Sequence, residues 1–149
     1  MFDPDTFMNT SFTEANDTSI TPCPVGEYTA IVDKWELKSW SSRDGEKSGL
    51  KLVVQWGIDD QNVKALLGRD NVRVPQDVML DLTEDGKGFD MGKGKNVNLG
   101  RLREALGLNT PGQPFSFDML TGRLAKVKVS HRTAGEDIFA EVKAVAKPS

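Results

Sequence analysis

The sequence NLGRLREALG, residues 98–107, decides the fold, because it is the clearest helical stretch among segments that read as strands. Its apolar residues recur at the spacing of one helix face, namely Leu99, Leu102, Ala105 and Leu106. Asn98 suits the N-cap position, and Gly107 suits the C-terminal stop. We therefore predict one short helix here, weakened by Gly100, since glycine costs up to ~1 kcal/mol inside a helix.

Three strands are predicted before this helix. Residues 27–38 form the first, with Thr29, Ile31, Trp35 and Leu37 on one period-2 face that Asp33 interrupts. Residues 50–58 form the second, with Leu50, Leu52, Val54, Trp56 and Ile58 on one face. The Asp44-Gly45 pair between them is typical of a hairpin turn. After a short helical turn in residues 62–69, residues 72–85 form the third strand, where Pro75 indicates an edge or a bulge.

Two further strands are predicted after the helix, in residues 123–132 and 138–146, and the turn TAGED joins them. Three strands, one helix and two strands is the order of the OB-fold. We therefore predict a mainly β chain whose residues 27–149 form a five-stranded OB-like Greek-key barrel, with one helix between the third and fourth strands. Leu99, Leu102 and Leu106 are expected to plug one end of that barrel.

Residues 1–26 are predicted to be an extended acidic N-terminal arm. Residues 1–27 hold five of the 22 acidic residues and none of the 19 lysines and arginines. This stretch also lacks periodicity, which favours an extended or partly disordered segment. The rest of the chain is therefore slightly basic, although the net charge of the whole is −3.

The composition excludes several classes of protein. One cysteine, Cys23, excludes an internal disulfide and favours a reducing, cytoplasmic setting. No apolar run approaches the ~20 residues of a membrane span, and we expect neither a signal peptide nor a membrane partner.

Residues that carry chemistry are too few to predict an enzyme. His131 is the one histidine, and it stands on a strand that ends at a turn, where surface or packing roles are common. A zinc site needs several nitrogen or sulfur ligands at defined spacing. The Asp59-Asp60 pair fits a strand-ending turn. We expect no catalytic residue, no metal and no cofactor.

The glycine-rich stretch of residues 85–107 does not match a nucleotide-binding loop. A Walker A loop needs Gly-Lys followed by Ser or Thr, whereas the two Gly-Lys pairs here are followed by Gly94 and Asn96. No βαβ unit surrounds it, as a dinucleotide motif requires. We predict a connection whose glycines let it move and whose nucleic-acid contacts are Phe89, Lys93 and Lys95.

Basic residues interleaved with aromatic rings are the stronger functional signal, because single strands bind to basic grooves and stack their bases on rings. Trp56 and Trp35 stand on apolar strand faces and are expected in the core. Trp40 and Phe89 stand in polar loop sequence and are expected to stack bases. The candidate nucleic-acid-binding residues are Trp40, Arg43, Lys47, Phe89, Lys93, Lys95, Arg101, Lys126, Lys128 and Arg132. The alternative for Lys126 and Lys128 is a solvated barrel exterior.

Seven stretches spread over nearly the whole chain carry a resemblance: FDPDTF, EAND, TPCPVGEYTAIVDKWELK, GLKLVVQWGI, LGRLREALG, LTGRLAKVKVSHR and GEDIFAEVKAV. Together they resemble a family of small phage and prophage proteins, and for a phage-encoded chain the expected cytoplasmic setting is that of the host cell. That family is described as single-stranded DNA-binding proteins with an OB-like fold. The resemblance implies a protein that coats single-stranded DNA without sequence preference in phage DNA replication or recombination. It assigns no individual binding residue, because the matching positions are mostly glycines and core residues.

The implied partners are single-stranded DNA, phage replication or recombination proteins and a further copy of the chain. Many single-strand binders end in an acidic tail that recruits partners, whereas this chain ends VKAVAKPS. The sequence therefore predicts either no recruitment through such a tail or recruitment through the acidic segment at the other end of the chain. Two other functions are left open: a β-rich phage structural or interaction protein of the virion, without nucleic-acid binding, and a nucleotide-handling enzyme, which is the least favoured.

Overall fold

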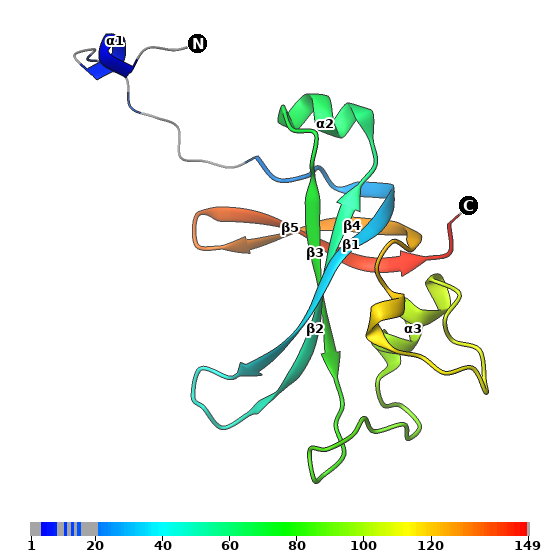
Figure 1. The fold of residues 1–149 in the computed structure, drawn as a ribbon. Coiled ribbons are helices and arrows are strands. Elements are labelled where there is room, and N and C mark those ends of the chain that lie inside the picture. Colours follow the sequence, from blue (N-terminus) through cyan, green and yellow to red (C-terminus); the bar gives the residue numbers. More distant parts are fainter. Residues whose placement is uncertain (1–3, 9–10, 12, 14, 16–20, 149) are drawn as a thin grey trace.

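The computed structural model describes residues 4–8, 11, 13, 15 and 21–148, and its main feature is one antiparallel sheet of five strands (Figure 1). The strands are β1 (Gly26–Ser41), β2 (Ser48–Ile58), β3 (Arg73–Leu80), β4 (Leu124–Ala134) and β5 (Asp137–Ala146). The helices are α1 (Pro4–Met8), α2 (Gln61–Leu67) and α3 (Val97–Ala105), with a 3₁₀ turn, η1 (Phe117–Met119). The predicted β-rich class is confirmed, and α3 lies between the third and fourth strands as expected.

The predicted arm falls mainly outside the described residues. Within residues 1–26, the structure describes α1, three single residues and residues 21–26. In the described part of the chain, no helix has the length and apolar character needed to cross a bilayer.

β1 is the central strand and changes partner along its length. Its first part, Gly26–Ile31, pairs with β4, and its longer second part, Ala30–Ser41, pairs with β2. The sheet order is β3-β2-β1-β4-β5, which makes β3 and β5 the edge strands. These two edges also contact each other, so the sheet curls on itself.

A β-bulge in β1 changes which residues face the core. The pairing register shifts between Val32 and Lys34, at Asp33, the residue that interrupts the sequence pattern. Ala30 and Val32 are buried before the bulge, whereas Trp35 packs against the core after it. The prediction that Thr29, Ile31, Trp35 and Leu37 share one face is therefore wrong, because the bulge puts Thr29 and Ile31 on the outside.

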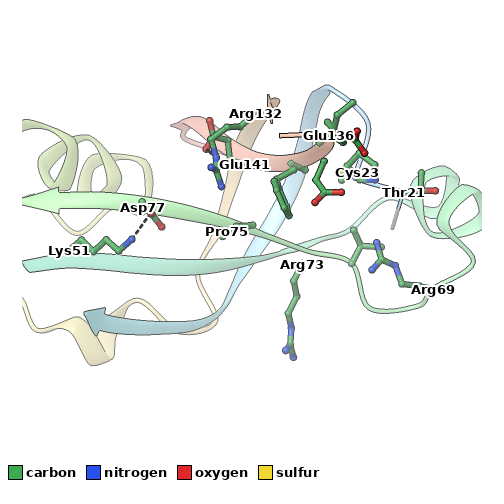
Figure 2. A pocket seen from close by; sticks show the side chains of 16 residues that line it. Thr21, Cys23, Lys51, Arg69, Arg73, Pro75, Asp77, Arg132, Glu136 and Glu141 are labelled. Atoms are coloured by element: carbon green, nitrogen blue, oxygen red, sulfur yellow. Dashed lines mark hydrogen bonds and ion pairs between the residues drawn. The ribbon is translucent and has the colours of Figure 1, made fainter. Parts of the chain in front are cut away.

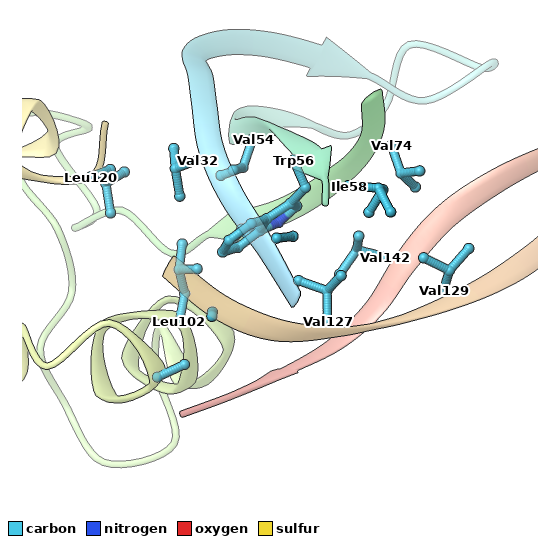
Figure 3. Close-up of a cluster of buried hydrophobic side chains, with 14 of the residues drawn as sticks. Val32, Val54, Trp56, Ile58, Val74, Leu102, Leu120, Val127, Val129 and Val142 are labelled. Carbon is cyan, nitrogen blue, oxygen red and sulfur yellow. The ribbon is translucent and has the colours of Figure 1, made fainter. Parts of the chain in front are cut away.

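Trp56 lies at the centre of the core (Figure 3). Its side chain is fully buried, and its Nε1 donates a hydrogen bond of 2.9 Å to Oε1 of Gln76. Strand valines and isoleucine surround it, and α3 contributes Leu102. Leu99 and Leu106 are buried as well. The predicted core positions of Trp56 and of the three helix leucines are confirmed.

Pro75 lies on β3 opposite Gln55 of β2. An edge strand tolerates proline because one side of its backbone has no strand to bond. The prediction of an edge strand at Pro75 is confirmed.

The β1–β2 hairpin is longer than predicted, and it extends away from the rest of the sheet (Figure 1). Trp40 pairs with Gly49 near its end. The prediction that Trp40 lies in a loop is therefore wrong, because the alternating pattern fades in polar residues before the pairing ends.

The predicted N-cap of α3 is wrong. The helix begins at Val97, which places Asn98 inside its first turn. Asn96 precedes the helix with a left-handed φ of 52° and makes no side-chain capping bond. Asparagine is among the few residues that adopt this conformation readily.

The predicted stop at Gly107 is confirmed. Gly107 has a φ of 73°, and its N–H donates to the carbonyl of Glu104 at 3.1 Å. The N–H of Leu108 donates to the carbonyl of Arg103 at 2.7 Å. These two bonds form a Schellman motif, which satisfies the last carbonyls of the helix.

Candidate functional site

The glycine-rich connection between β3 and α3 has defined local structure. Leu82 and Phe89 form an isolated antiparallel bridge. Thr83 donates its N–H to the carbonyl of Gly88 at 2.8 Å, and Asp90 donates its N–H to the carbonyl of Asp81 at 2.9 Å. The connection is therefore a small hairpin-like loop that presents Phe89 from one of its arms.

Asn96 ties the base of this loop together. Only 7% of Asn96 is exposed, and its Oδ1 accepts the N–H of Asp81 at 2.8 Å. Its Nδ2 donates to the carbonyls of Asp81 and Asp90, both at 2.9 Å, and its N–H donates to Oδ2 of Asp81 at 2.7 Å. One residue thus joins the end of β3, the returning arm of the loop and the start of α3.

A groove of about 490 Å³ lies between this loop, α3 and the segment that precedes β4. Its aromatic lining comes from Phe89 in the loop and from Phe115 and Phe117 near η1. The Phe117 ring centroid lies 5.8 Å from that of Phe89, 5.5 Å from that of Phe115 and 5.6 Å from that of Trp35. We call this hollow the aromatic groove.

Two cations line the aromatic groove, Lys95 and Arg103, and no aspartate or glutamate does. The guanidinium carbon of Arg103 lies 4.5 Å from the centroid of the Phe115 ring, in cation–π geometry. Arg103 Nε also donates to the carbonyl of Leu108 at 3.1 Å. Because Leu108 bonds back to the carbonyl of Arg103, the end of the helix holds this side chain in place.

Gly100 leaves part of the groove open. It lines the groove on α3, and a Cβ built there would meet no atom within 4 Å beyond its chain neighbours and the backbone of its own helix. Its φ does not lie in the left-handed region, so other residues fit the backbone at this position. Gly100 is therefore the residue that is predicted to weaken the helix and also the residue that leaves space on the groove wall.

Of the ten predicted binding residues, Phe89 and Lys95 line the aromatic groove. Lys93 is exposed in the same loop, outside the lining. Arg101 is exposed on another face of α3, with Nη1 3.5 Å from Oδ1 of Asn98.

Trp40, Arg43 and Lys47 lie together at the end of the β1–β2 hairpin. The indole of Trp40 covers Gly49, whose Cβ would stand 2.8 Å from Nε1 of Trp40. Within the described residues, this Nε1 is the one buried side-chain nitrogen or oxygen without a hydrogen-bond partner. Asp44 lies between the two cations, and a hydrogen bond from Ser42 lowers the pKa of its carboxyl.

The remaining predicted cations lie on β4. Lys126 Nζ lies 3.8 Å from Glu27, whereas Lys128 is exposed. Arg132 Nε lies 3.5 Å from Glu141. The predicted set is therefore spread over the hairpin end, the loop, α3 and β4, and it forms no single cluster.

Sequence reasoning missed Phe115, Phe117 and Arg103. The two phenylalanines stand in the polar, proline-rich stretch of residues 109–117. A large ring in polar sequence is the same signal that indicates Phe89, and it could have indicated these two residues as well. Arg103 stands among the basic residues of the predicted helix, but its stacking on Phe115 depends on a contact across the fold.

A second and larger hollow, about 1100 Å³, lies between β3 and the β4–β5 hairpin (Figure 2). We call it the β3–β5 cleft. Its cations are Lys51, Arg69, Arg73 and Arg132, and its acids are Asp77, Glu136, Asp137 and Glu141. Lys51 pairs with Asp77 at 2.9 Å, Arg132 pairs with Glu141, and Arg73 pairs with Asp33. Its positive charge is therefore largely offset.

The residues with catalytic chemistry make structural contacts. Cys23 is buried, and this burial raises the pKa of its thiol. Nε2 of His131 lies 2.7 Å from the carbonyl oxygen of Cys23, and Asp60 caps α2 by accepting the N–H of Val63. In the described part of the chain, no group of three or more His, Cys, Asp or Glu residues could hold a metal ion.

Neither the models of known protein families nor the curated proteins contain a match to this chain.

Proposed function

We propose that the chain is a sequence-independent single-stranded DNA-binding protein, built on an OB-like barrel and acting in phage DNA replication or recombination in the host cytoplasm. The observation that carries this proposal is the aromatic groove, where three phenylalanine rings and two cations meet without a carboxylate. Rings that stack bases and cations that follow the phosphates are the two parts of a single-strand site.

The arrangement of strands supports the OB-like part of the proposal. The order β3-β2-β1-β4-β5, the contact between β3 and β5 and the place of α3 in the chain agree with a small Greek-key barrel. In this barrel the aromatic groove lies beside α3, and a bound strand would continue towards the exposed Lys93.

The test is a titration of the full chain with oligo-dT, followed by tryptophan fluorescence. A base that enters the groove stacks near Phe117, whose centroid is 5.6 Å from the Trp35 ring, so we expect the fluorescence to change. Affinity should fall as salt rises, because phosphate contacts release counterions. Double-stranded DNA of the same length is the control, and we expect it to bind more weakly. No binding of oligo-dT at about 10 μM in low salt would overturn the proposal.

A second candidate function is that of a phage interaction protein of the virion. Ile138 and Phe139 are 50% and 45% exposed on the edge strand β5, which is where another protein chain could pair. Co-purification of the chain with phage capsids, together with failure to bind oligo-dT, would favour this function over the first.

A further inference from the structure

The charged groups that line the aromatic groove are all hydrogen-bond donors. Lys95 and Arg103 donate and cannot accept, and no carboxylate lines the groove. Asn96 offers little to a ligand, because its Oδ1 already accepts one hydrogen bond and its Nδ2 already donates two. The neutral Asn109 and Ser116 can each donate or accept, and Nδ2 of Asn109 lies 3.5 Å from Oε1 of Glu104, so the donor bias rests on the two charged groups.

Arg103 is prepared to bind a planar ligand edge. Its guanidinium lies against Phe115, and its Nε is used by the carbonyl of Leu108. Within the described residues its Nη groups make no hydrogen bond, so they are free to donate to a ligand. A guanidinium held in this way loses little freedom when it binds a pair of acceptors.

The nucleobases differ in what they offer to such donors. Guanine presents O6 and N7 as adjacent acceptors, and thymine presents keto oxygens. Adenine and cytosine each place an exocyclic amino group, a donor, at the corresponding edge. A carboxylate would accept from that amino group, and none lines this groove.

The size of the groove limits how much of a strand can enter. Its volume of about 490 Å³ lies in the lower part of the ~300–1,000 Å³ range of small-molecule pockets. Phe117 touches three other rings, so only part of its surface is open to a base. The groove therefore fits one unstacked base and not a run of bases.

We propose that the aromatic groove holds one keto base, guanine or thymine, of single-stranded DNA in preference to adenine or cytosine, and that Arg103 reads the acceptor edge. This inference rests on the proposed function and adds a local base preference to it. The rest of the bound strand is held through its phosphates, without regard to sequence.

The test uses oligonucleotides of one length in which abasic residues flank a single central base. This design keeps the phosphates constant and removes stacking within the strand. We expect the strands with guanine or thymine to bind the full chain about tenfold tighter than those with adenine or cytosine, as one hydrogen bond to a charged group predicts. A strand with 7-deazaguanine, which lacks N7, should bind more weakly than the guanine strand.

Two variants locate the preference in the groove. Arg103→Lys keeps the charge and removes the planar fork, so guanine should lose more affinity than thymine. Gly100→Leu fills the groove wall and should abolish the difference among the four bases, with Gly100→Ala as the control that keeps it. Thermal melting of each variant shows that it is folded.

The outcomes separate this proposal from the proposed function. Equal binding of the four single-base strands, or tighter binding of the strands with adenine or cytosine, would overturn the keto-base preference. Binding of oligo-dT in the same experiments would still uphold the proposed function. Preference that survives in Gly100→Leu would place the reading outside the aromatic groove and overturn the assignment. Failure to bind any single strand, oligo-dT included, would overturn the function itself.

Discussion

The aromatic groove and the β3–β5 cleft differ in a way that size does not explain. The cleft is more than twice as large and holds four cations, whereas the groove holds two. Four acids line the cleft as well, and three of its four cations lie in ion pairs. The groove has fewer cations, but no acid among its lining residues opposes them.

From this difference we expect unopposed charge beside exposed rings to be a better guide to an anionic ligand than cavity volume. A phosphate entering the cleft would meet cations that already have partners, together with carboxylates that repel it. The exposed ion pairs there contribute little stability, about 0–1 kcal/mol each. Their main effect on an approaching strand of DNA would be to lower the attraction that the cleft exerts.

Of the variants that distinguish the aromatic groove from the β3–β5 cleft, we expect Asn96→Ala to have the largest effect. It removes three side-chain hydrogen bonds at the base of the loop and leaves the N–H of Asp81 without its acceptor. We expect the free energy of unfolding to fall by about 2–4 kcal/mol, measured by urea unfolding, and the groove to lose DNA affinity.

Asn98→Ala is the matched control, because Asn98 makes one long side-chain contact, 3.5 Å to Arg101. We expect a change within about 0.5 kcal/mol for this exposed position. A similar cost for both variants would mean that Asn96 does not hold the loop.

Filling the groove should have the next largest effect. Gly100→Leu places a side chain in the open space on the groove wall, so we expect oligo-dT affinity to fall by at least about tenfold, the value of one lost stacking contact. Gly100→Ala should bind normally and raise the stability by up to ~1 kcal/mol. Normal binding by Gly100→Leu, measured by fluorescence titration, would place the DNA elsewhere.

A comparison of two exposed phenylalanines gives a smaller effect. Phe89 lines the groove and Phe139 lines the cleft, and they are 37% and 45% exposed. Phe89→Ala should weaken DNA binding by about 1–2 kcal/mol with little change in melting temperature. We expect Phe139→Ala to bind within twofold of the parent, and the reverse ranking would make the cleft the binding site.

The smallest effect concerns the salt dependence of binding. Lys95 has no ion pair within the described residues, so Lys95→Ala should reduce the slope of log affinity against log salt by ~0.7. Lys51 already pairs with Asp77, and Lys51→Ala should leave the slope unchanged. Equal slopes for the two variants would show that ion pairing does not distinguish the hollows.

Local patterns predicted most of the secondary structure and missed features that depend on distant contacts. Alternation predicted the strands, and the Leu99 stripe and Gly107 predicted the helix. The bulge at Asp33 changed the inward face of β1, because pairing with β2 decides the register there. Asn96 and Asn98 are equally good caps by residue type, and their roles differ because Asp81 lies beside the first.

Dependence on distant contacts also limits how much of the aromatic groove could be predicted from the sequence. Phe89 was identified as a ring in polar sequence, and Lys95 as a cation near it. Their meeting with Phe115 and Phe117 depends on a return of the chain after α3, which no short pattern records. Residue type thus indicated candidate contacts, while the fold selects the few that face one another.

The burial of Cys23 makes this chain convenient for attaching a dye. It is the one cysteine of the sequence, only 3% is exposed, and burial raises the pKa of its thiol, so maleimide should react with it slowly. A cysteine introduced at the exposed Lys87, near the tip of the glycine-rich loop, would then be the one fast-reacting thiol. A single fluorophore attached there would allow single-molecule fluorescence measurements of binding to single-stranded DNA. The native cysteine in the core would not have to be removed first.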